Sequence, residues 1–218
     1  MIVDERLAVY INSLDQGNTQ FLNELEEKAI ADYVPIIRKE MQSFLKTLLA
    51  IKRPKRILEV GTAVGFSTLL FHEYAPPDTK ITTIEKYAKR VPLAKENFKK
   101  AGANRITLIE GDALDILKEL PGSYDFIFMD AAKGQYIHFL PEVLRLLEKD
   151  GILISDNVLQ DGEIIESRFA IDRRNRTIYK RMRDYLYELK HTEQLITSIL
   201  PIGDGVTLST KIGEGVSK

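Results

Sequence analysis

The sequence predicts an α/β fold with a seven-stranded, mostly parallel sheet, helices on both faces, a C-terminal antiparallel hairpin and additional N-terminal helices. Two patterns predict this fold. From residue 55 onward, short apolar runs alternate with amphipathic stretches, which is typical of a parallel sheet covered by helices. Near the C-terminus, two further apolar runs flank an Asp-Gly pair at 204–205, a strong signal for a tight turn between antiparallel strands.

The N-terminal segment predicts three helices. Its apolar residues recur at helical spacing within 7–14, 21–29 and 36–49. Asn18 and Thr19 are both candidate N-caps for the second helix. Pro35 suits the first turn of the third helix, because a proline there removes no hydrogen bond of that helix.

The alternating region predicts the remaining elements in order. The parallel strands are expected at 56–60, 80–84, 105–109, 124–129 and 151–155, and the hairpin strands at 194–200 and 206–211. Helices are expected near 65–75, 88–102, 112–120, 134–148 and 174–190. We expect one domain over 1–218, in which a helical segment, 1–54, precedes the core, 55–218.

Composition and charge exclude several classes of function. Apolar residues make up 44% and charged residues 29%, as in ordinary globular proteins. The chain has no cysteine, which excludes disulfides and thiolate metal sites. The net charge of −1 predicts no polyanion partner from bulk charge, and DNA is not expected. With neither a long apolar run nor a signal peptide, we expect a cytoplasmic protein that does not bind membranes.

A glycine turn follows the first predicted strand, and its spacing favours one kind of ligand. Gly61 and Gly65 lie four residues apart, and Ala63 replaces the middle glycine of a dinucleotide-binding turn. The turn therefore suits a cofactor without a pyrophosphate, which disfavours a dehydrogenase. The alternative is a strand-to-helix turn that simply requires small residues.

Acidic residues end the next two predicted strands. Glu85 lies 24 positions after Gly61, where a carboxylate can accept hydrogen bonds from both hydroxyls of a ribose. Asp112 follows Gly111 after the third strand and could reach an adenine amino group. The N-cap of the following helix is an equally good interpretation of Asp112.

Oxygen-bearing side chains follow the fourth and fifth predicted strands. Asp130 ends the fourth strand, and Asp156 and Asn157 end the fifth. If these strands are neighbours, the three side chains meet at one edge of the sheet. An all-oxygen set suits a hard cation such as Mg²⁺ or Ca²⁺, with places left for water or substrate. Singly, each acid could instead be a helix cap or a solvated strand end.

These motifs in series resemble the class I S-adenosylmethionine (SAM)-dependent methyltransferases, and the likeness extends from residue 35 to the C-terminus. The resemblance implies a Rossmann-like core in which Glu85 holds the ribose and Asp112 and Ala113 lie at the adenine. It implies that the Gly61 loop and Ser67 lie along the methionine end, and it implies further cofactor contacts at Glu59 and Asp130.

The acidic set narrows the resemblance to the metal-dependent O-methyltransferases that include the catechol and caffeoyl-CoA enzymes. The resemblance implies that Asp130, Asp156 and Asn157 bind Mg²⁺ or another hard divalent cation. It also implies that Lys133, acting with Asp130, helps to deprotonate the accepting hydroxyl.

The residues around Lys133 bear on the substrate. Catechol enzymes carry a bulky aromatic beside this lysine, whereas here Ala131 and Ala132 precede it and the chain has no tryptophan. The run from Asp130 to Tyr136 is similar to a bacterial branch that includes the tRNA 5-hydroxyuridine methyltransferase. That likeness implies a tRNA substrate, a homodimer and a cofactor contact at Ile37. A small catechol-like or hydroxycinnamoyl acceptor remains the alternative, and a non-catalytic RNA-binding protein is the alternative from another class.

A basic segment gives the tRNA hypothesis an electrostatic basis. Residues 173–183 hold six basic residues and no acid, so the rest of the chain carries −7. Candidate phosphate contacts are Arg173, Arg174, Arg176, Lys180 and Arg183. The alternative is a solvated helix face that pairs with nearby acids such as Asp172 and Asp184.

Overall fold

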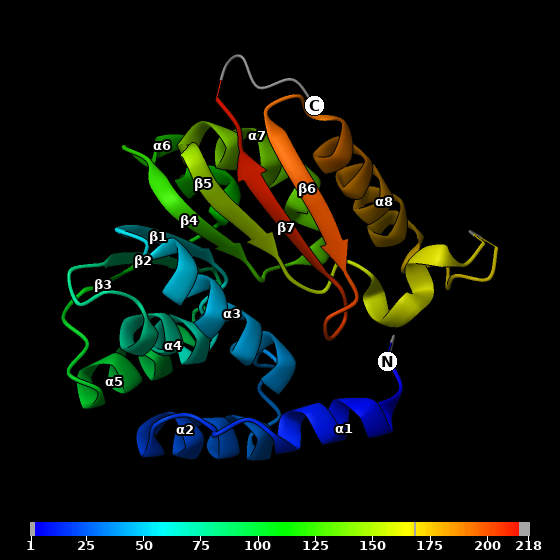
Figure 1. Cartoon of the computed structure of the whole chain (residues 1–218). Coiled ribbons are helices and arrows are strands. Elements are labelled where there is room, and N and C mark those ends of the chain that lie inside the picture. The colour runs from blue at the N-terminus through cyan, green and yellow to red at the C-terminus, as the bar shows by residue number, and fades with distance from the viewer. Residues whose placement is uncertain (1–2, 168, 214–218) are drawn as a thin grey trace.

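The computed structural model, which describes residues 3–167 and 169–213, contains a seven-stranded sheet of order β3-β2-β1-β4-β5-β7-β6 (Figure 1). The strands are β1 (Arg56–Val60), β2 (Lys80–Glu85), β3 (Ile106–Glu110), β4 (Tyr124–Met129), β5 (Leu147–Ser155), β6 (Leu195–Leu200) and β7 (Val206–Lys211). β1 to β5 pair in parallel, whereas β7 is antiparallel to both β5 and β6. The predicted fold class is therefore confirmed, including the C-terminal hairpin.

Helices cover both faces of the sheet and form two apolar cores. One core includes α2 (Gln20–Ala31), α3 (Lys39–Lys52), α4 (Phe66–Tyr74) and α5 (Val91–Lys100). The other includes α6 (Ala113–Glu119), α7 (Tyr136–Leu146) and α8 (Arg176–His191). The remaining elements are α1 (Glu5–Ser13) and two short 3₁₀ helices, η1 (Lys133–Gln135) and η2 (Gln160–Ile165). Because both faces are buried, the central strand β4 is almost wholly apolar.

The N-terminal helices differ from their prediction at one point. Thr19 caps α2 by accepting from the backbone N–H of Leu22, as one of the two candidates predicted. The third helix begins at Lys39, so the prediction that Pro35 lies in its first turn was wrong. Arg38 is still extended, and the carbonyl of Ile37 accepts from the side chain of Gln42 instead of entering the helix. The segment before α3 therefore stays extended, which allows it to lie close to the sheet.

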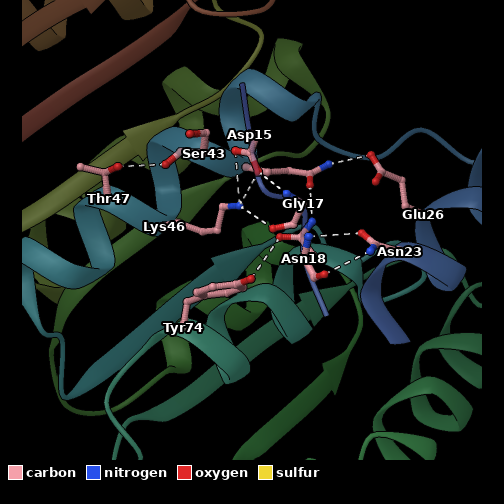
Figure 2. A network of polar contacts seen from close by, with 10 residues as sticks. Asp15, Gly17, Asn18, Asn23, Glu26, Ser43, Lys46, Thr47 and Tyr74 are labelled. Carbon is pink, nitrogen blue, oxygen red and sulfur yellow. Dashed lines mark hydrogen bonds and ion pairs between the residues drawn. The ribbon is translucent and has the colours of Figure 1, made fainter. Parts of the chain in front are cut away.

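A polar network joins the N-terminal helices to one another (Figure 2). Lys46 of α3 binds Asp15 at 3.2 Å, in the link between α1 and α2. Gln42 of α3 accepts from Asn18 at 2.7 Å and donates to Glu26 of α2 at 2.9 Å. Since the same Gln42 amide also donates to Ile37, this network fixes the extended segment that precedes α3.

The surface of α1 carries large exposed apolar side chains. These are Leu7, Val9, Tyr10 and Ile11, and Leu14 follows directly after the helix. The homodimer stays a prediction, and an exposed apolar helix face of this kind is typical of a contact surface. Among the described residues, no helix combines the length and apolarity that a membrane crossing requires.

Candidate active site

A cavity of about 890 Å³ lies at the carboxyl ends of the parallel strands, where the strand order reverses between β1 and β4. Open α/β sheets bind ligands at this kind of switch point. The structure brings most of the predicted site residues into its lining. They are Ile37, Gly61, Ser67, Glu85, Asp112, Ala113, Asp130, Lys133, Asp156 and Asn157.

The glycine turn packs directly on the end of β4. A side chain at Gly61 would place its Cβ 2.0 Å from the backbone oxygen of Asp130, and the residue has φ +105°. Gly65 has φ +88°, and a Cβ there would lie 2.5 Å from the ring of Phe98. Glycine is therefore required at both positions, which explains the spacing. The close approach holds one cavity wall beside the predicted metal ligand.

Glu85 presents its carboxylate to the cavity in a fixed orientation. One oxygen accepts from the backbone N–H of Ala63 at 2.7 Å, and the other accepts from that of Tyr87 at 2.7 Å. The residue is only 8% exposed. Each oxygen keeps a further lone pair, so the carboxylate can accept two more hydrogen bonds from vicinal hydroxyls.

Asp112 fulfils the capping interpretation while lining the cavity. Its side chain accepts from the backbone N–H of Leu114 at 3.0 Å, at the start of α6. It also lies 2.6 Å from the ammonium of Lys86. The hydrogen bond from Lys86 and the one from Leu114 lower the pKa of Asp112, which therefore remains ionised. The two interpretations offered by the sequence are compatible at this position.

Glu59 does not line the cavity, which argues against its predicted contact with the cofactor. Its side chain is fully buried and accepts from the hydroxyls of Ser67, Thr68 and Thr83. Burial raises its pKa to about 7, although the three hydroxyl donors oppose the shift. Glu59 thus joins β1, β2 and α4 beneath the glycine turn, and it supports the cavity wall from below.

We expect this burial to make stability depend on pH. The folded chain holds the Glu59 proton up to about pH 7, whereas the unfolded chain releases it near 4.5. Stability should therefore fall as pH rises through that interval, by up to about 3 kcal/mol from this group. Denaturant unfolding of the unmutated chain and of Glu59→Gln should give curves that diverge over this range. Parallel curves would show that Glu59 does not titrate there.

An acidic pair lies at the other end of the cavity, as the sequence predicts. Asp156 is 4% exposed, and its Oδ1 accepts from the backbone N–H of Asn157 at 2.7 Å. Burial raises the pKa values of both Asp130 and Asp156, and the charge of Asp130 raises that of Asp156 further. The charge of Lys133 acts in the opposite direction on both. Asn157 has a left-handed φ of +58°, a strain that is common at functional sites.

The donor set fits a hard cation. Among the described residues, no three side chains of His, Cys, Asp or Glu gather in a metal-binding group. The predicted set instead combines two carboxylates with the amide of Asn157, which leaves coordination places for water or substrate. The repulsion between Asp130 and Asp156 is what a divalent cation would relieve.

Sequence reasoning missed an ion pair at the cavity. Arg38, in the extended segment before α3, lies 2.6 Å from Asp204, in the turn between β6 and β7. Asp161 of η2 lies 3.5 Å from the same guanidinium. Arg38 and Asp204 both line the cavity. The sequence explains Asp204 as a turn residue, and no local motif marks Arg38, so only the tertiary fold brings them together.

The basic segment lies outside the cavity lining. Arg174 lies 3.6 Å from Asp172 and Lys180 lies 3.8 Å from Asp184, as the solvated-face interpretation expected. The structure assigns local contacts to two other candidates, since Arg176 donates to the carbonyl of Ile171 and Arg183 donates to the hydroxyl of Tyr179. Arg173 is exposed.

Comparisons with known proteins place the fold and cavity in a family. The model of the O-methyltransferase family matches residues 12–212. The chain belongs to the O-methyltransferase family. It is 32% identical over 179 residues to caffeoyl-CoA O-methyltransferase 1 of Eucalyptus globulus, covering 78% of this chain and 72% of that one. Identity to tapetum-specific methyltransferase 1 of Arabidopsis thaliana is 30% over 205 residues, with 88% and 87% covered.

A solved member of the same fold carries a product of methyl transfer. The SAH-bound methyltransferase PaMTH1 of Podospora anserina is 28% identical and superposes with a TM-score of 0.87. The match covers 96% of this chain and 95% of that chain. The resemblance to O-methyltransferases that the sequence motifs indicated is thereby confirmed at the level of the family.

Proposed function

We propose that this O-methyltransferase uses SAM and a divalent cation to methylate an acceptor that carries two adjacent oxygens. The observation that supports this most strongly is the arrangement of one cavity. Glu85 and Asp112 line one part of it, and Asp130, Lys133 and Asp156 line another. The SAH-bound PaMTH1, which shares the fold, supports SAM as the methyl donor.

The proposed reaction assigns a role to each group of side chains. Glu85 would accept the ribose hydroxyls of SAM, whose sulfonium supplies the methyl group. Asp130, Asp156 and Asn157 would hold Mg²⁺, whose positive charge would favour the deprotonated form of an acceptor hydroxyl. Lys133, in its neutral amine form, would take the proton of the accepting hydroxyl at its Nζ atom and become an ammonium. The cavity walls would orient the nucleophilic oxygen in line with the departing sulfur.

The cofactor end of this proposal has a direct test. Glu85→Ala should weaken SAM binding by roughly 1–3 kcal/mol, because the ribose hydroxyls lose their acceptor. Calorimetric titration of SAM measures the change. Glu110→Ala is a suitable control, because Glu110 ends the adjacent strand β3 with an exposed carboxylate outside the cavity lining. Equal affinities of Glu85→Ala and the unmutated chain would remove Glu85 from the site.

For the acceptor, we propose 5-hydroxyuridine in tRNA, whose 5-hydroxyl lies beside the 4-carbonyl oxygen. The basic segment supports this choice, because Arg181 of α8 donates to the carbonyl of Gly134, the residue next to Lys133. A phosphate backbone bound along α8 would therefore pass close to the cavity. The alternative, a small catechol-like or hydroxycinnamoyl acceptor, is supported by the caffeoyl-CoA O-methyltransferases among the relatives.

Neutralising the basic segment should separate the two acceptors. Replacing Arg173, Arg174 and Lys180 with glutamine should weaken tRNA binding and flatten its salt dependence by roughly 0.7–0.9 in log-log slope per lost phosphate contact. Methylation of catechol should stay unchanged, since the cavity is untouched. The matched control replaces three exposed lysines of α5, Lys95, Lys99 and Lys100, with the same change in charge. Equal tRNA binding by both triple variants would favour a small acceptor.

A further inference from the structure

A buried tyrosine joins the two strand ends that carry the acidic pair. Tyr136 is the first residue of α7 and is fully buried. Its hydroxyl donates a bifurcated hydrogen bond to the carbonyl oxygens of Met129, at 3.1 Å, and of Asp156, at 3.2 Å. The same oxygen accepts from the backbone N–H of Ala131 at 3.2 Å. One phenol therefore contacts backbone on both sides of Asp130 and the backbone of Asp156 itself.

These contacts close a short loop. The chain leaves β4 at Met129, passes through Asp130 and Lys133, and returns at Tyr136 to hydrogen-bond its own starting point. The ends of β4 and β5 are already joined by a hydrogen bond of 3.0 Å, which the backbone N–H of Asp156 donates to the carbonyl of Met129. The phenol adds a second connection between these ends, so it restricts how far the two carboxylates can separate.

Tyr136 is itself held from α8. The ring of Tyr185 packs edge-on against it with centroids 5.5 Å apart, and the Tyr185 hydroxyl lies 2.6 Å from that of Ser155. Arg181 also fixes the loop through the carbonyl of Gly134 at 3.1 Å. Burial and the charges of Asp130 and Asp156 raise the pKa of Tyr136, so its hydroxyl stays protonated and continues to donate.

We propose that Tyr136 is a positioning residue, whose hydroxyl fixes the spacing of Asp130 and Asp156 and thereby sets the affinity of the site for a divalent cation. The inference rests on the proposed metal-dependent function, and it assigns a role to a residue that contacts neither cofactor nor substrate. Groups that orient metal ligands from behind typically contribute 10- to 100-fold in metal affinity.

The test compares Tyr136→Phe with Tyr124→Phe. Both substitutions remove one phenol oxygen and keep the ring, but Tyr136 begins α7 beside the acidic pair, whereas Tyr124 lies at the far end of β4 and contacts Thr82. Mn²⁺ binding is measured by electron paramagnetic resonance, and SAM binding by calorimetry. We expect Tyr136→Phe to weaken Mn²⁺ binding about 10- to 100-fold and to leave SAM affinity unchanged. Tyr124→Phe should change neither.

Four outcomes would overturn the inference, and each points to a different part of it. Unchanged Mn²⁺ affinity in Tyr136→Phe would contradict the positioning role alone. Parallel losses of Mn²⁺ and SAM binding would show that the hydroxyl only supports the fold. If the unmutated chain binds no Mn²⁺ and methylates in excess chelator, the metal-dependent function fails as well. Should Tyr136→Phe fail to fold, Tyr185→Leu removes the ring that packs against Tyr136, and Mn²⁺ affinity equal to that of the unmutated chain would then overturn the inference.

Discussion

Asp156→Asn should reduce methyl transfer by about 1,000-fold while SAM still binds. Asparagine keeps the shape of the side chain and can still accept from the backbone of Asn157, so the loop remains in place. The loss of one charge weakens the hold of the site on a hard cation, so the acceptor hydroxyl stays protonated. Single-turnover rates with saturating SAM and acceptor measure this step without interference from binding.

The same variant should fold at least as well as the unmutated chain. Burial and the neighbouring charge of Asp130 disfavour the ionised form of Asp156, so a neutral side chain relieves that repulsion. Asp115→Asn is the matched control, because Asp115 is an exposed acid on α6 outside the cavity lining. A large drop in thermal stability of Asp156→Asn, or normal turnover, would show that this carboxylate is structural.

Lys133 has the second largest expected effect, and two substitutions separate its two contributions. Lys133→Met should lower turnover by about 10²–10⁴-fold, because it removes the neutral amine that would accept the proton and the positive charge that the same side chain carries when protonated. That charge lowers the pKa values of Asp130 and Asp156 and so favours their ionised forms. Lys133→Arg keeps the charge but cannot accept a proton near neutral pH.

We therefore expect Lys133→Arg to keep the Mn²⁺ affinity of the unmutated chain while its turnover stays as low as that of Lys133→Met. Titration of Mn²⁺ and single-turnover kinetics on the same preparations provide the comparison. Turnover restored by arginine would mean that only the charge at this position matters. Turnover unchanged by methionine would remove Lys133 from the reaction.

The fold could be predicted from the sequence because its signals are local. The apolar run Tyr124–Met129 marks a strand buried on both faces, and Asp204-Gly205 marks the hairpin turn. Motifs at strand ends were informative for the same reason. Parallel strands bring their carboxyl ends to one edge, so Glu85, Asp130 and Asp156 could be placed around one cavity from their positions alone.

The features that sequence reasoning missed depend on tertiary contacts. Glu59 precedes the glycine turn, yet strand alternation directs its side chain under the turn and not into the cavity. Arg38 reaches the cavity because the third helix begins later than Pro35 suggested. Tyr136 lies at an ordinary helical position, and its contacts with two strand ends appear only when α7 packs on the sheet.

The central claim is that the chain transfers a methyl group from SAM to one of two adjacent acceptor oxygens with the help of a divalent cation. The most direct test follows labelled methyl from SAM into catechol and into tRNA that contains 5-hydroxyuridine. The matched controls are phenol and tRNA that contains uridine, each of which lacks one oxygen of the adjacent pair. We expect transfer to at least one adjacent-oxygen acceptor, its loss in excess chelator and its recovery with Mg²⁺. Equal transfer in the presence of excess chelator would contradict the account.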